Sequence, residues 1–381
     1  VTLDASALSS GNGSNIAVWA NDSTRIYGKI LANGGLNGGN GGFVETSGKN
    51  YLDVNGSSVS TLAPLGATGT CLLDPTIIYI AVDLATAKAA GMTGNDQSAS
   101  SGSGTFQATG PVQNSLLLTS TLNGALGTSD VIVTTTNTNP SATAPGDIIV
   151  VSPISWGSTH SLTLTAARNI TIKSSITDSA AGSLILNAAG SVTQDATSVI
   201  GGALNFIQQG AGTVNLNSNN TYTGLTTIKN GTVNIMSIGN YSGGASSLGN
   251  PASGAITLGD ATNNTLGTLS YVASGSGVSD RSIVLAGAAG GAIQVTAGSF
   301  LALSGNISGA APLNKAGAGE LYLFGLKTYT GITTIGEGVF SASSLSNQGS
   351  NSSVGTNTVL LNGGTLSYIG NTTTSTRNIS V

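Results

Sequence analysis

Residues 162–186 read LTLTAARNITIKSSITDSAAGSLIL, and apolar side chains alternate with polar ones in three short runs of this stretch. The runs are 162–165, 169–172 and 183–186, and small or polar residues separate them. Successive side chains of a strand point to opposite faces, so each alternating run predicts a short strand with one buried face.

The apolar positions of these runs recur at a fixed spacing. Two series share a 22-residue period: Leu162, Leu184, Phe206 and Ile170, Val192, Val214. A fixed period indicates stacked modules in which each coil buries its apolar face on the next. We therefore predict an all-β fold, an elongated right-handed parallel β-helix (β-solenoid) with loop excursions.

A second repeat has a longer, 107-residue period. Three short segments return at that offset: 210–212 as 317–319, 221–224 as 328–331, and 226–228 as 333–335. The chain ends at Val381, before the second copy is complete, and opens in a strand-like pattern at Val1. We therefore expect a piece of a longer protein, with any export signal upstream.

The composition excludes several classes of protein. Charged residues are only 7% of the 381 residues, against roughly 25% in an ordinary soluble domain. No apolar run approaches the ~18–20 residues of a membrane-spanning helix, and 39% hydrophobic residues at regular spacing argue against disorder. The net charge of −4 without a basic cluster argues against a nucleic-acid partner. The single cysteine, Cys71, allows no internal disulfide.

Several stretches resemble known secreted proteins. Residues 16–24, 28–32, 41–48 and 72–75 (IAVWANDST, GKILA, GGFVETSG and LLDP) closely resemble filamentous-haemagglutinin-like exoproteins of two-partner secretion in Gram-negative bacteria. Cys71 stands where that family usually has an aromatic residue. Residues 210–228 resemble the passenger-associated repeat of autotransporters. The resemblance implies a parallel β-helix, export to the surface and frequently adhesion, and it transfers no catalytic residue.

Four segments follow from these patterns. We expect haemagglutinin-like β-helix coils over 1–83, a loop or short helical excursion over 84–111, coils of about 22 residues over 112–208, and autotransporter-type repeat coils over 209–381. Within the excursion, 84–90 could form one or two helical turns, and the Ser/Gly-rich run 95–104 reads as a surface loop.

The sequence offers little chemistry. The only histidine, His160, lacks the context of a catalytic triad, and one His with one Cys provides almost no zinc ligands. Three aspartate pairs are candidate hydrolase carboxylates, with turn capping as the alternative: Asp130 and Asp147, Asp178 and Asp195, Asp260 and Asp280. We expect no catalytic residue, no metal and no cofactor.

Tyr222 and Tyr329 occupy equivalent positions of the 107-residue repeat. They are the candidate contact residues, as exposed platforms for sugar stacking, and packing at a coil junction is the alternative interpretation.

Together these observations favour a segment of a large secreted bacterial surface adhesin, located outside the cell, that acts as a rigid stalk for attachment or biofilm contact. The expected partners are surface glycans or proteins of host or bacteria, further copies of the chain, and an outer-membrane transporter during export. Two alternatives stay open: a subunit of a self-assembling extracellular filament, and a β-helix enzyme that degrades polysaccharides. The export route, two-partner or autotransporter, also stays open.

Overall fold

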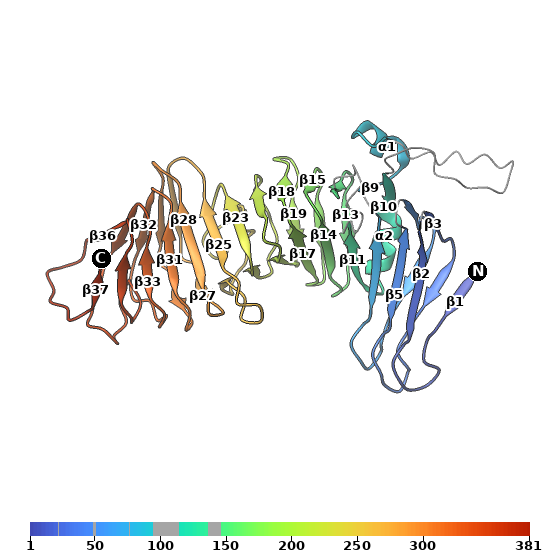
Figure 1. Ribbon diagram of the computed structural model, residues 1–381, viewed down its shortest axis with the longest axis horizontal. Helices are drawn as coiled ribbons and strands as arrows, with labels where there is room; N and C mark the ends of the chain where they lie inside the picture. Colours follow the sequence, from blue (N-terminus) through green and yellow to red (C-terminus); the bar gives the residue numbers. More distant parts are fainter. Residues whose placement is uncertain (22, 49–50, 76, 94–113, 136–145) are drawn as a thin grey trace. The chain divides into compact units, whose positions relative to one another are not determined.

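The computed structural model describes residues 1–21, 23–48, 51–75, 77–93, 114–135 and 146–381 (Figure 1). These residues form two compact units, Val1–Ser198 and Val199–Val381. The described strand pairings within each unit are parallel, and each strand pairs with its counterpart from a neighbouring coil. The predicted parallel β-solenoid is thereby confirmed.

The first unit winds strands of three to six residues into several sheets. One sheet contains, in order, β2 (Asn15–Ala20), β5 (Phe43–Gly48), β8 (Thr70–Asp74), β11 (Asp130–Thr134), β14 (Leu162–Ala166) and β17 (Ser183–Ala188). A second contains β10 (Ser115–Leu118), β9 (Ile78–Ala81), β12 (Ile148–Val150), β15 (Ile170–Ile172) and β18 (Ser191–Gln194). Smaller groups are β1 (Thr2–Asp4), β4 (Lys29–Leu31) and β7 (Ser58–Ser60); β3 (Ser23–Arg25) and β6 (Tyr51–Asp53); and β13 (Ile154–Trp156) and β16 (Ile176–Asp178).

The predicted 22-residue spacing holds from β12 to β18. Leu162 pairs with Leu184 across β14 and β17, and Ile170 pairs with Val192 across β15 and β18. All four side chains are fully buried, while the residues that alternate with them along the strands face outward. Columns of aliphatic residues therefore fill the interior and drive the stacking of coils.

The second unit has three faces, and β19 (Ile200–Gly202) precedes them. Face A contains β20 (Asn205–Gln208), β22 (Thr226–Ile228), β24 (Ile256–Leu258), β27 (Ile283–Leu285) and β30 (Ile307–Ser308). Face B contains β21 (Thr213–Leu216), β23 (Gly231–Ile235), β25 (Gly267–Tyr271), β28 (Gly291–Val295), β31 (Leu313–Ala316), β33 (Thr333–Ile335), β35 (Val359–Leu361) and β37 (Ile379–Ser380). Face C contains β26 (Ser276–Ser279), β29 (Phe300–Leu303), β32 (Glu320–Leu323), β34 (Val339–Ala342) and β36 (Thr365–Tyr368).

Among the described residues of the first unit, two helices interrupt the coils. Helix α1 (Leu84–Ala89) lies where helical turns were predicted, and the Asp83 carboxylate caps it by accepting the Thr86 N–H at 2.7 Å. Helix α2 (Thr119–Leu126) is a correction, because coils alone were expected over 112–208. Its Ser, Thr, Asn and Gly residues are weak helix formers, and burial of Leu122 and Leu126 on one face outweighs that propensity.

Two further expectations concern the course of the chain. The surface loop expected at 95–104 lies outside the described residues, and the change of module expected at 208/209 stays a prediction. None of the described helices is long and apolar enough to span a membrane.

Candidate functional site

The two copies of the 107-residue repeat lie in the second unit, and each centres on one of the candidate tyrosines. Tyr222 and Tyr329 are both fully buried. The Tyr222 hydroxyl lies 2.9 Å from the Thr226 hydroxyl, and the Tyr329 hydroxyl lies 2.6 Å from that of Thr333. Burial raises the pKa of Tyr222 to about 12 and that of Tyr329 above its usual range. The geometry does not support exposed sugar platforms, and it places both rings at coil junctions.

A glycine packs against each tyrosine ring. Gly249 and Gly355 have φ angles of +69° and +70°, a region that favours glycine. A β-carbon would come within 2.9 Å of the Tyr222 ring at Gly249 and within 2.7 Å of the Tyr329 ring at Gly355. Both the backbone conformation and the neighbouring ring therefore require glycine at these positions.

In each copy of the 107-residue repeat, a buried arginine forms hydrogen bonds to one loop. Arg377 donates hydrogen bonds to loop 343–358 through its whole guanidinium: to the carbonyl oxygens of Ser346 (3.1 Å), Asn347 (3.3 Å), Ser350 (3.0 Å), Gly355 (3.1 Å) and Asn357, and to the Ser352 hydroxyl (3.2 Å). Arg281 likewise donates to the Leu248 carbonyl of loop 236–255 at 2.8 Å. Desolvation lowers the pKa of both arginines, and the nearby tyrosine opposes that effect.

Contacts around the two arginines match. The Asp280 N–H donates to Asn240 Oδ1 at 3.0 Å, and the Thr376 N–H donates to Asn347 Oδ1 at 2.9 Å. The residue after each arginine also bonds to the same loop. The Ser282 N–H donates to the Tyr241 hydroxyl, and the Asn378 N–H donates to Gln348 Oε1. We call each arginine with its loop a loop clamp. Sequence reasoning missed it, although Ser-x-Arg-x-Ile occurs at 279–283 and again at 375–379.

Two lysines of the second copy are buried among carbonyl oxygens. Lys327 Nζ donates to the carbonyls of Gly305 and Phe324, both at 2.6 Å, and to two longer contacts. Lys315 Nζ donates to the carbonyls of Ala316 (2.8 Å), Gly317 (2.5 Å) and Glu337 (3.0 Å). Burial lowers the pKa of each lysine to about 8. In the first copy, Gln208 and Asn220 hold the equivalent positions.

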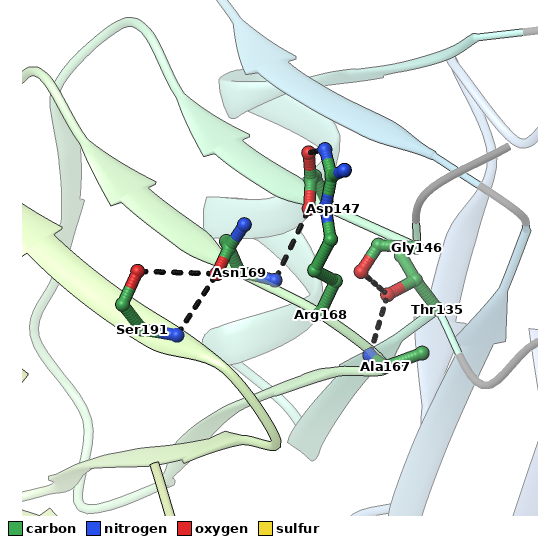
Figure 2. Close-up of polar contacts among 7 residues, drawn as sticks. All are labelled: Thr135, Gly146, Asp147, Ala167, Arg168, Asn169 and Ser191. Atoms are coloured by element: carbon green, nitrogen blue, oxygen red, sulfur yellow. Dashed lines mark hydrogen bonds and ion pairs between the residues drawn. The ribbon is translucent and has the colours of Figure 1, made fainter. Parts of the chain in front are cut away.

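A polar ladder follows one corner of the first unit (Figure 2). Asp147 Oδ1 accepts the Asn169 N–H at 3.1 Å, and Asn169 Oδ1 accepts the Ser191 N–H at 2.9 Å, one coil further on. Arg168 forms an ion pair with Asp147, and half of its side chain is exposed. The ladder satisfies corner N–H groups that the strands leave unpaired, so its role is structural.

Of the candidate aspartates, Asp178 and Asp260 cap local turns, while Asp280 bonds to a loop 39 residues earlier in the chain. Asp178 accepts the Gly182 N–H at 2.5 Å, Asp260 the Thr262 N–H at 2.9 Å, and Asp280 the Tyr241 N–H at 2.8 Å. His160 is also held locally, with Nδ1 2.9 Å from the Leu126 carbonyl oxygen and Nε2 3.2 Å from the Thr68 hydroxyl. In the part of the chain that the structure describes, no three His, Cys, Asp or Glu residues gather into a metal site.

Comparison with known protein families finds one family model that matches the repeat. The family model of the passenger-associated-transport repeat matches residues 206–235 and 313–342. Both segments are similar to passenger-associated-transport repeats. The matched residues coincide with β20 to β23 and with β31 to β34, at the 107-residue offset found in the sequence.

One curated relative extends the comparison beyond the passenger repeats. Over 178 residues the chain is 35% identical to the adhesin BmaC autotransporter of Brucella suis biovar 1 (strain 1330). The alignment covers 44% of this chain and 5% of that protein, so the chain spans a small part of its relative's length. The resemblance to autotransporter passengers is confirmed. The haemagglutinin-like features and the two-partner route stay predictions.

Proposed function

We propose that the chain is a segment of a secreted bacterial surface adhesin, located outside the cell, in which it acts as a non-enzymatic stalk. The observation that carries this proposal is the pair of passenger-associated-transport repeats built into a parallel solenoid. The similarity to an autotransporter adhesin supports it. An outer-membrane transporter would export the chain, and surface glycans or proteins, or further copies of the chain, would be its partners.

The construction of each unit suits a mechanical role. Backbone hydrogen bonds connect every coil to the next, so each coil restrains its neighbours. The loop clamps add contacts from coil to loop that keep the excursions of the second unit packed down. Asp178 and Asp260 already accept backbone N–H groups, which argues against a role for these two carboxylates in polysaccharide degradation.

Surface display tests the proposal. The chain, fused to an autotransporter barrel in a bacterial host, is expected to be released from intact cells by added protease. Cells that display it are expected to adhere to epithelial monolayers or form biofilm more than cells with the barrel alone. Retention inside the cell, or adhesion equal to that of the barrel control, would contradict the proposal. Regular fibres formed by the purified chain under electron microscopy would favour the filament alternative.

A further inference from the structure

The outer surface of face C carries three aromatic rings in mutual contact. Phe300 on β29 lies beside Tyr322 on β32, with ring centroids 5.9 Å apart and planes inclined at 42°. Tyr322 also contacts Phe324, with centroids 3.8 Å apart and planes inclined at 56°. All three rings are partly exposed to solvent, and Phe324 is 38% exposed. We call Phe300, Tyr322 and Phe324 the aromatic patch.

The fold does not require these rings. At the equivalent positions of the first repeat, Asn215 replaces Tyr322 and Asn217 replaces Phe324. There the Asn234 side-chain amide donates to Asn215 Oδ1 at 2.8 Å, which forms an outward ladder between coils. One repeat thus uses polar residues and the other aromatic residues at the same outward positions. Since both versions sit on a regular coil, the aromatic version calls for an explanation other than folding.

Polar groups border the aromatic patch. Glu320 precedes Tyr322 by two residues on the same outward side of β32 and pairs in register with Phe300. The Ser341 hydroxyl donates to Glu320 Oε1, which fixes the carboxylate beside the rings. Among the described residues, the Tyr322 hydroxyl has no hydrogen-bond partner and Glu320 has no cationic partner. A ligand would therefore meet apolar ring faces, one phenol and one orientated acceptor.

These groups select the class of ligand. Three rings could together bury at most ~450–750 Å², which is below the ~800 Å² per partner of a stable protein interface. The fold already covers part of each ring, and Phe324 is only 38% exposed, so the area left for a partner is smaller still. An acidic ligand would be repelled by the unneutralised Glu320 carboxylate. A neutral sugar combines an apolar C–H face with hydroxyls at its rim, which matches ring faces bordered by an acceptor and a phenol.

We propose that the aromatic patch of face C is a binding site for neutral saccharides, with Phe300, Tyr322 and Phe324 stacking on sugar rings and Glu320 accepting hydrogen bonds from their hydroxyls. The proposal deepens the proposed adhesin function and rests on it for its biological meaning. The binding itself is a property of the chain in solution, so it can be measured without any adhesion assay.

Saturation-transfer NMR on the full chain tests the site. The probes are cellotetraose, maltotetraose and tetra-N-acetylchitotetraose as neutral ligands, tetragalacturonate as an anionic one, and tetralysine as a cationic one. At least one neutral probe is expected to bind. The double substitution Tyr322→Asn/Phe324→Asn, which copies the first repeat, is expected to weaken that binding at least tenfold. The control Leu225→Asn removes an apolar side chain elsewhere that is 50% exposed, against 38% for Phe324, and should leave binding unchanged.

Several results would overturn the assignment. They are no binding of any neutral probe, undiminished binding by the double variant, or stronger binding of tetralysine or tetragalacturonate. Dimerisation that disappears in the double variant would instead assign the patch to a second copy of the chain. If the double variant fails to fold by circular dichroism, Phe324→Asn alone serves the same comparison. Adhesion of displaying cells without saccharide binding would refute the site while leaving the adhesin proposal intact.

Discussion

Ile228 ends a strand of face A, whereas Ile335, its counterpart in the second repeat, ends a strand of face B. The whole passenger repeat shifts in the same way: β20 to β23 alternate between faces A and B, and β31 to β34 alternate between faces B and C. The repeat is therefore a local unit that can be placed at different corners of the solenoid. Its buried tyrosine, glycine and loop clamp accompany it to the new corner.

Gly355→Ala tests how strictly the position beside the Tyr329 ring requires glycine. We expect a loss of roughly 3 kcal/mol in unfolding free energy, because the new methyl group adds a clash with the Tyr329 ring to the strain of a positive φ. Gly325→Ala is the control, since Gly325 has the same φ of +70° with no atom within 4 Å of a β-carbon. It should cost only about 1 kcal/mol. Equal costs in chemical denaturation would show that the ring contact is unimportant.

Arg377→Lys tests the loop clamp. Lysine keeps the charge but cannot present the guanidinium fork that bonds several carbonyls at once, so we expect a loss of roughly 3 kcal/mol. Limited proteolysis should also cut within 343–358 sooner. The matched change Arg168→Lys alters an exposed ion pair and should cost less than about 1 kcal/mol. A clamp variant as resistant to protease as the wild type would disprove the role.

The buried lysines predict an unusual dependence on pH. The pKa of Lys327 falls from 10.5 to about 8 on folding, so the unfolded chain binds more protons between those values. Unfolding free energy should therefore rise from pH 8 toward pH 10, by at most about 1.4 kcal/mol per pH unit for each such lysine. Above pH 10 the buried tyrosines oppose the rise, because their pKa is raised by burial.

The substitution Lys327→Asn introduces the residue type that the first repeat has at this position. It should remove the contribution of Lys327 to the rise of unfolding free energy with pH, as measured by denaturant unfolding at pH 7.5, 8.5 and 9.5. The exposed Lys173→Gln serves as the comparison and should retain the wild-type slope. A slope that persists unchanged in the Lys327 variant would count against the assignment.

Asn169 offers a test of the polar ladder of the first unit. Asn169→Ala removes the oxygen that accepts the Ser191 N–H and hydroxyl, so we expect a loss of about 1 kcal/mol. Asn169→Asp retains an acceptor at the same place and should recover most of that stability. Faster hydrogen exchange at the Ser191 amide in the alanine variant only is the expected signature. Equal hydrogen-exchange rates at the Ser191 amide in both variants would show that the ladder does not stabilise the stacking of these coils.

Alternation and period in residues 162–186 were sufficient to predict the coils from β12 to β18, where paired residues lie 22 apart. The shift of the second repeat to new faces could not be predicted, because coil length varies. Along face B, Gly231 pairs with Gly267 whereas Leu313 pairs with Thr333, so the chain between paired positions is much longer in the first case. Two segments that lie 107 residues apart in sequence therefore need not lie on the same face of the solenoid.

The candidate site was predicted less well. Tyr222 and Tyr329 were correctly singled out as equivalent, but repeat position alone does not distinguish a buried ring from an exposed one. Alternation does contain that signal. In 321–324 the residues Leu321 and Leu323 take the inward positions, which leaves Tyr322 and Phe324 outside. The arginines were missed because they act on a loop from the following coil.

The buried cations of the second unit bond to main-chain carbonyls rather than to carboxylates, and Arg168 with Asp147 is the one ion pair within the described ranges. Dissolved ions weaken attraction between exposed charges, with a Debye length that shortens from ~30 Å at 0.01 M to ~3 Å at 1 M. Enclosed contacts with peptide oxygens escape most of that weakening. The coils should hold almost equally well in fresh water and in brine, which suits a protein whose surroundings the cell does not control.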